Sequence, residues 1–282
     1  MRVGDAFEVR VLEPGPPAVD DAPWFADDPV AEAPRVHPDR PLLSPVPNSG
    51  RTWDELARTE VDLSVWCADR WLGAWRRLPP LPPLAAYARA RDELHELAAT
   101  VVSPAREAVN GKIGLRYTYL GFGTPFFGDD EQLRVHAASQ RVLHADEHTP
   151  PRDLAPPGAF LGEWYGFACS VLEDLRARVG VDAGPSRVQL WPEHFDMSVD
   201  LGVEADGSRG TFGASPGDAD HPEPYLYVTH WAEVPDDPYW NDAAFPGASL
   251  PLATLVAADD QRETALEFFR RGSDRLRGRL AR

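Results

Sequence analysis

The sequence is poor in cysteine and has no long hydrophobic run. Its 282 residues include two cysteines, Cys67 and Cys169, which form neither a CxxC pair nor a zinc-binding pattern with histidine. No window approaches the roughly 18 consecutive apolar residues of a membrane-spanning helix, and the N-terminus lacks the apolar stretch of a signal peptide. We therefore expect buried free thiols in a cytoplasmic protein that has no membrane partner.

Positive charge is scarce as well. The chain has 28 Lys and Arg residues against 45 Asp and Glu residues, which gives a formal net charge of −17. A field of that sign repels the phosphate backbone of nucleic acids and anionic lipid surfaces. The one arginine-dense stretch, residues 262–282, has the spacing of the outer face of a helix. We therefore expect no nucleic-acid partner.

Lysine is almost absent, because Lys112 is the only one in the chain. Arginine in place of lysine, with abundant alanine, glycine and proline, is typical of a high-GC bacterial genome. On that interpretation Lys112 is a lysine that has not yet been replaced by arginine. The alternative is that Lys112 is functional, since only an amine can form a Schiff base or act as a tunable base. Lys112 is therefore one candidate ligand-binding residue.

The common catalytic signatures are missing. The chain has no GxSxG, HExxH or GxxxxGK[ST] motif, and no GxGxxG between a strand and a helix. Gly121-Phe122-Gly123 is only a fragment of a glycine loop. These absences argue against the familiar serine hydrolases, zinc proteases, P-loop enzymes and dinucleotide-binding enzymes.

Proline and acidic side chains dominate residues 1–50, a composition that favours extended chain over helices or sheets. Residues 51–282 are predicted to form a single α+β domain. Because its strands are joined by turns, we expect a mainly antiparallel sheet with helices on one face. Two helix-then-strands blocks, at about 84–148 and 159–231, suggest diverged repeats that divide the domain into halves at 51–150 and 151–282.

Apolar residues at helical spacing predict helices over 52–75, 84–102, 159–179 and 259–280. Alternation and turn residues predict strands at 113–120, 132–136, 140–148, 193–203, 209–215 and 225–231. Asn110-Gly111 is expected to be a turn that opens the first strand, and the glycine-rich stretch after residue 120 is expected to be a loop. Residues 232–257 are predicted to be a proline-rich connection.

The most distinctive stretch runs from Glu193 to Val203. Its alternation predicts a half-buried strand that places apolar residues on one face and His194, Asp196, Ser198 and Asp200 on the other. An imidazole, a hydroxyl and two carboxylates in one row are a more specific selection than a solvent-facing strand needs. Glu193 follows Pro192 where the alternation slips by one residue, which predicts a bulge.

Aromatic residues concentrate in the predicted strands, among them Tyr117, Trp191 and Tyr227. They suit either the core or the wall of an apolar pocket with a few polar groups at its base. Our leading hypothesis is a protein that binds a small molecule in such a pocket, with His194, Asp196 and His230 at its polar end. The full set of candidate ligand-binding residues is Lys112, Tyr117, Trp191, Glu193, Tyr227 and His230.

An enzyme is the second hypothesis. His194, Asp196, His221 and Glu223 could supply nitrogen and oxygen ligands to a divalent metal such as zinc, manganese or iron. Without a metal, His194 tuned by Asp196 could act as a general acid or base in a hydrolase-like reaction. The simpler interpretation, which argues against both the metal site and the acid–base site, is that these histidines lie on the surface beside acidic residues. A third hypothesis is an interaction protein that recruits a partner through its acidic surface and its proline-rich N-terminal arm.

Three segments, VNGKIGLRYTYLGFGTPFFG, LWPEHFDMSVDLG and GASPGDADHPEPYLYVTHW, resemble an uncharacterised bacterial protein family common in high-GC genomes. The resemblance extends from about residue 50 onward. The chain is also distantly similar to a broader family of unknown function, in which paired helix-plus-strand blocks carry a W-x-x-F-D-like strand. The resemblance implies this layout of helices and strands and no catalytic assignment.

Overall fold

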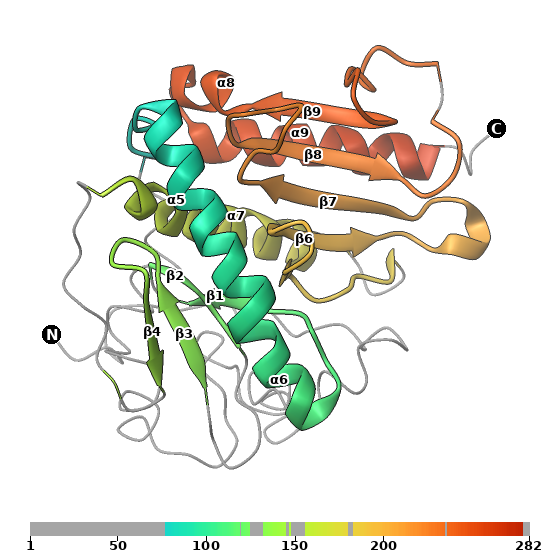
Figure 1. Ribbon diagram of the computed structural model, residues 1–282. Coiled ribbons are helices and arrows are strands. Elements are labelled where there is room, and N and C mark those ends of the chain that lie inside the picture. The colour runs from blue at the N-terminus through green and yellow to red at the C-terminus, as the bar shows by residue number, and fades with distance from the viewer. Residues whose placement is uncertain are drawn as a thin grey trace, which may run out of the picture.

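Figure 1 shows the protein as a computed structural model, which describes residues 77–118, 120–124, 132–144, 147, 156–179, 183–234 and 236–278. The expected N-terminal segment 1–50, the expected helix 52–75 and Cys67 lie outside the described residues. Cys169 is buried as a free thiol, as expected. No helix within the described ranges is long and apolar enough to span a membrane.

The first described helix is longer than its apolar pattern predicts. α5 (Leu84–Leu97) continues through a π-helical stretch (Ala98–Val102) into α6 (Ser103–Asn110). Pro104 does not end the helix, although it lies inside this continuous helical run, directly after the π-helical stretch. Gly111 caps α6 in the left-handed conformation with φ 71°, so Asn110-Gly111 ends a helix and does not directly open the first strand, which begins at Arg116.

Four short strands follow in antiparallel order: β1 (Arg116–Thr118), β2 (Gly121–Gly123), β3 (Leu133–His136) and β4 (Arg141–His144). The prediction of a glycine loop after residue 120 is therefore wrong. Thr118 of β1 pairs with Gly121 of β2, and Leu120 between them adopts φ 58°. Glycine is needed at 121 because a Cβ there would lie 1.8 Å from the Val135 carbonyl oxygen.

Helix α7 (Pro157–Arg178) lies at the centre of the molecule and contacts strands of both sheets. Its long apolar stripe explains this position, because Trp164, Tyr165 and Val171 are fully buried. The predicted helix 159–179 is thereby confirmed. The two sheets meet through reciprocal backbone hydrogen bonds of 2.8 Å between Leu115 and Leu190.

The second sheet has five antiparallel strands in sequence order: β5 (Gln189–Trp191), β6 (Asp196–Leu201), β7 (Gly210–Ser215), β8 (Tyr225–His230) and β9 (Gly247–Pro251). The chain ends with α8 (Leu252–Ala257) and α9 (Gln261–Arg277). Strand β9 and helix α8 lie in the stretch expected to be a connection, so that prediction is wrong. The predicted strand from Glu193 is also too long, because Pro192–Phe195 form a turn.

The α+β class with antiparallel sheets is confirmed. The structure contains two helix-then-sheet blocks, but their descent from one repeated unit stays a prediction.

Within β6–β8 the alternation separates two faces. The inner face packs against α7 and α9 and includes Met197, Val199, Leu201, Phe212, Leu226 and Val228. We call the opposite side the polar face. It includes Trp191, Asp196, Ser198, Asp200, Thr211, Gly213, Tyr225 and Tyr227 and, just beyond the strand ends, Arg209 and Trp231. In Figure 1, α9 runs behind β8 and β9, so the polar face points toward the viewer.

Candidate functional site

The turn between β5 and β6 is anchored to two helices. His95 of α5 lies parallel to the ring of Phe195, with ring centres 5.0 Å apart, and its Nε2 bonds the Pro192 carbonyl oxygen at 2.8 Å. Tyr165 of α7 donates its hydroxyl to the Phe195 carbonyl oxygen at 2.6 Å. Phe195 adopts φ 54°, and its amide donates to the carbonyl oxygen of Trp191 at 2.7 Å. The turn thus fixes where β6 begins.

Four side chains meet on the polar face just after this turn: Trp191, Asp196, Ser198 and Tyr227, which we call the carboxyl cluster. The Tyr227 hydroxyl donates to Asp196 Oδ2, and the Trp191 indole N–H donates to Ser198 Oγ at 3.1 Å. Gly213 lies between Ser198 and Tyr227 in the strand register. The Tyr227 ring lies directly over Gly213, since a Cβ there would be 2.3 Å from its Cζ. A glycine therefore allows the tyrosine to reach the carboxyl.

Asp196 is the most unusual member of the cluster. Asp196 is 5% exposed, and its Oδ1 is a buried atom with no hydrogen-bond partner among the residues that the structure describes. Burial is the largest influence on the pKa of Asp196 and raises it, although the bond from Tyr227 and the charge of His194 act in the opposite direction. Burial likewise raises the pKa of Tyr227, and the adjacent Asp196 raises it further. A proton is thus held more strongly by this pair than by the same groups in water.

A second carboxylate on the polar face has a full set of partners. Thr211 donates to Asp200 Oδ1 at 2.7 Å, and the Trp231 indole N–H donates to Thr211 Oγ1 at 3.0 Å. The Arg209 guanidinium lies 4.8 Å from the Trp231 ring centre and 3.6 Å from Asp200 Oδ2. We call Asp200, Arg209, Thr211 and Trp231 the arginine cluster. Its carboxylate is compensated within the chain.

His221 belongs to a separate group on the loops beside β8. Its Nε2 is 3.0 Å from Asp242 Oδ2, and its ring packs on Tyr225 at 4.6 Å between ring centres. The Asp242 carboxyl is 1% exposed. Burial would raise the pKa of Asp242, but hydrogen bonds from Ser249 and backbone amides, with the charge of His221, lower it overall. The sequence does not predict Asp242 as a site residue, because the loop that contains it carries no periodic pattern.

The structure brings together only some of the predicted site residues. Glu193 and His194 are exposed on the turn beside the carboxyl cluster, and Glu223 is exposed on a loop. The expected grouping of His230 with Asp196 is wrong. His230 is three residues from Tyr227 on β8, so the two side chains lie on opposite faces of the sheet. On the inner face the His230 ring bonds the carbonyl oxygens of Gly207 and Glu233.

Tyr117 and Lys112 are also separated from Asp196. Tyr117 is buried beneath α7, with its hydroxyl against Gly166, and is therefore a core residue and not a pocket wall. Lys112 is half-buried in the connection between α6 and β1. For the proposed metal set of His194, Asp196, His221 and Glu223 the result is similar. Among the residues that the structure describes, no three His, Cys, Asp or Glu side chains are grouped closely enough to hold a metal ion.

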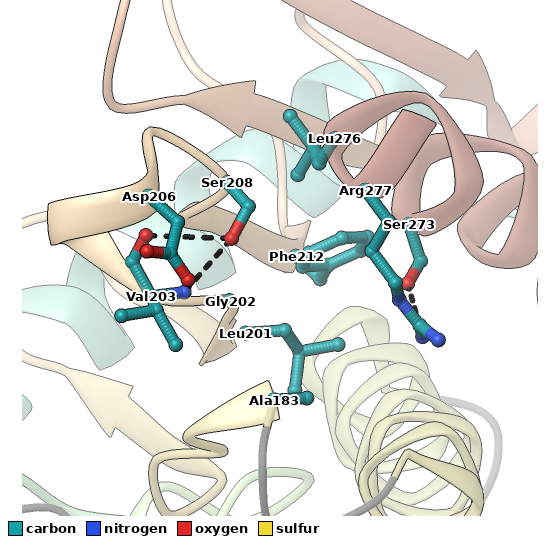
Figure 2. A pocket seen from close by; sticks show the side chains of 10 residues that line it. All are labelled: Ala183, Leu201, Gly202, Val203, Asp206, Ser208, Phe212, Ser273, Leu276 and Arg277. Atoms are coloured by element: carbon teal, nitrogen blue, oxygen red, sulfur yellow. Dashed lines mark hydrogen bonds between the residues drawn. The ribbon is translucent and has the colours of Figure 1, made fainter. Parts of the chain in front are cut away.

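A cavity of about 300 Å³ opens at the other end of β6 (Figure 2). Leu201, Phe212 and Leu276 form its apolar floor, and both serines at its edge are already hydrogen-bonded, Ser273 to Arg277 and Ser208 to backbone. None of the predicted site residues lines it. At about 3.3 Å per strand residue, it lies roughly 16 Å along β6 from Asp196.

No family model, curated protein or solved structure matches this chain. The resemblance to an uncharacterised bacterial family therefore stays a prediction, and the case for a function rests on side-chain geometry.

Proposed function

We propose that the protein binds a small molecule at the carboxyl cluster. The observation that carries this proposal is Asp196 Oδ1, a buried acceptor that has no partner within the described part of the chain. Leaving such an atom unpaired costs about 1–3 kcal/mol, and a ligand that donates a hydrogen bond would recover that energy. Both oxygens of a carboxylate in a core are normally hydrogen-bonded, so a carboxyl oxygen left without a partner is a candidate binding group.

The surroundings of Asp196 suit an organic ligand. Trp191 and Tyr227 flank the carboxyl and are both half-buried, so each offers ring surface as well as a polar atom. Phe245 extends the aromatic surface, with its ring centre 6.3 Å from that of Tyr227. Apolar walls with a few fixed polar groups are the usual composition of a small-molecule site.

Acid–base catalysis at the same cluster is the second candidate function. It is favoured by the pairing of Asp196, whose pKa is raised, with the Tyr227 hydroxyl. A carboxyl that keeps its proton nearer to neutral pH can serve as a general acid. The exposed imidazole of His194 on the adjacent turn would then be available to exchange protons with solvent.

A thermal-shift screen of a small-molecule library against the full chain tests the proposal, with each hit repeated on Asp196→Asn. We expect hits that stabilise the wild-type protein and whose apparent affinity, calculated from the thermal shift, is at least tenfold weaker in Asp196→Asn. Asp206→Asn is the matched control, because it makes the same change at an exposed carboxylate that lines the cavity of Figure 2. A library without hits, or hits that depend on Asp206 and not on Asp196, would refute the proposal.

A further inference from the structure

The polar face carries the same three chemical groups twice. Each cluster has a carboxylate on β6, a hydroxyl next to it and an indole whose N–H donates to that hydroxyl. In the arginine cluster these are Asp200, Thr211 and Trp231. In the carboxyl cluster they are Asp196, Ser198 and Trp191, although the hydroxyl that bonds the carboxyl there is that of Tyr227.

The arginine cluster contains a cation that the carboxyl cluster lacks. The Arg209 guanidinium lies between the Trp231 ring and the Asp200 carboxylate, and also donates to the carbonyl oxygens of Gly202 and Gly184 at 3.1 and 3.3 Å. This combination of an aromatic face and a carboxylate is a favourable environment for a guanidinium or ammonium group.

No described arginine, lysine or histidine forms an ion pair with Asp196. The nearest basic side chain that influences it is His194, which is exposed on the turn. Arg91 of α5 is engaged with Asp92 and the Pro222 carbonyl oxygen. The carboxyl cluster therefore has the acceptor and the aromatic rings without the positive charge.

From this comparison, and resting on the proposed function, we infer that the ligand of the carboxyl cluster is an organic cation, an ammonium or guanidinium group attached to an apolar body. The N–H groups of the cation donate to Asp196 Oδ1, as Arg209 approaches Asp200. The apolar body packs on the rings of Trp191 and Tyr227.

The cation reaches Asp196 by displacing the Trp191 indole. Asp196 Oδ1 is covered, but Trp191 is half-buried and the structure gives its indole a single hydrogen bond, to Ser198. Tyr227 holds the other carboxyl oxygen and stays in place. We therefore expect binding to change the fluorescence of Trp191, which a Trp191→Phe variant would identify among the tryptophans.

Four probes test the charge of the ligand by calorimetric titration of the full chain: benzylguanidinium, benzylammonium, benzyl alcohol and benzoate. We expect the two cations to bind at least tenfold more tightly than benzyl alcohol, and benzoate to bind most weakly. Asp196→Asn should reduce the preference for the cations to less than threefold. Asp200→Asn is the matched control and should retain it, because Asp200 already has Arg209.

The outcomes separate this inference from the proposed function. If a neutral or anionic library hit depends on Asp196 while the cations do not bind, the site stands and the cationic ligand is wrong. If neither the library nor the probes bind, both are wrong. An equal loss of cation preference in Asp196→Asn and Asp200→Asn would show general attraction to an acidic protein, which also overturns the inference.

The pH dependence of benzylguanidinium binding provides an independent readout. The titratable groups that influence or contact Asp196 are His194, Asp200, Tyr227 and, from α7, Tyr165. Affinity should rise with pH as Asp196 ionises, and Asp196→Asn should remove that rise. His194→Gln separates the contribution of the imidazole, since loss of its charge would also favour a cation. A flat profile in the wild-type protein would contradict a carboxylate–cation contact.

Discussion

The two faces of β6–β8 differ in how their buried residues are satisfied. On the inner face Met197, Val199 and Phe212 lie in a continuous apolar core beneath α7 and α9. On the polar face Asp196 and Ser198 are nearly as inaccessible as those core residues, at 5% and 3% exposure, yet they are polar. Burial on the inner face therefore stabilises the fold, whereas burial on the polar face has to be compensated group by group.

That difference explains why the candidate site lies on one face only. Apolar packing is non-directional, so the inner face tolerates many arrangements of similar volume. Hydrogen bonds are directional, and a single missing partner leaves an atom such as Asp196 Oδ1 unsatisfied. Substitutions on the two faces should therefore differ in their cost to stability.

Phe212→Ala should destabilise the protein by about 3–5 kcal/mol, because it empties a fully buried position whose ring meets Phe269 at 6.0 Å between centres. Thr211→Ala, the adjacent residue on the polar face, should cost about 1 kcal/mol through its lost hydrogen bonds. Urea unfolding of both variants measures the difference. Similar losses in the two would mean that the faces are not energetically distinct.

Gly213→Ala should cost about 1–3 kcal/mol, because the new methyl group would force the Tyr227 ring away from Asp196. The cost should fall when Tyr227 is already alanine, so a double-mutant cycle isolates the contact. If Gly213→Ala costs the same in both backgrounds, then backbone conformation and not the tyrosine ring requires the glycine.

Asp196 and Asp242 should respond to pH in opposite directions. The pKa of folded Asp196 is raised, so its favourable contribution is present at low pH and is lost as pH rises from about 4 through the folded pKa. The pKa of folded Asp242 is lowered, so its contribution is present above about 4 and is lost as pH falls through the folded pKa.

Urea unfolding between about pH 3 and about pH 8, a range that spans the ordinary carboxyl pKa of about 4, measures how the free energy of unfolding changes with pH. Asp196→Asn should gain stability relative to wild type as pH rises, by at most about 1.4 kcal/mol per pH unit, and Asp242→Asn should gain relative to wild type as pH falls. Parallel pH profiles for the two variants would contradict the opposite environments of these carboxyls.

Arg209→Ala should cost only about 1 kcal/mol, because its guanidinium gains a partly exposed ion pair and a ring contact. The loss should shrink in 1 M salt, where exposed charges are screened within roughly 3 Å. A much larger or salt-independent loss would show that Arg209 mainly holds the Gly202 and Gly184 carbonyl groups in place.

By itself the sequence determined the features that depend on neighbours along the chain. The spacing of apolar residues located α7, β7 and β8, and the alternation through Asp196, Ser198 and Asp200 assigned these residues to one face. These predictions succeed because helix and strand periodicity is a local property of the backbone. The same parity would have placed His230 away from Tyr227.

Tertiary structure alone decided which residues meet at Asp196. Tyr227 lies 31 positions away, and it reaches the carboxyl only because the register of β7 and β8 sets Gly213 between them. The turn that starts β6 is held by contacts with α5 and α7, which no local pattern encodes. Whether a buried carboxyl keeps or lacks a partner is likewise a property of the assembled sheet, because its donors come from different strands.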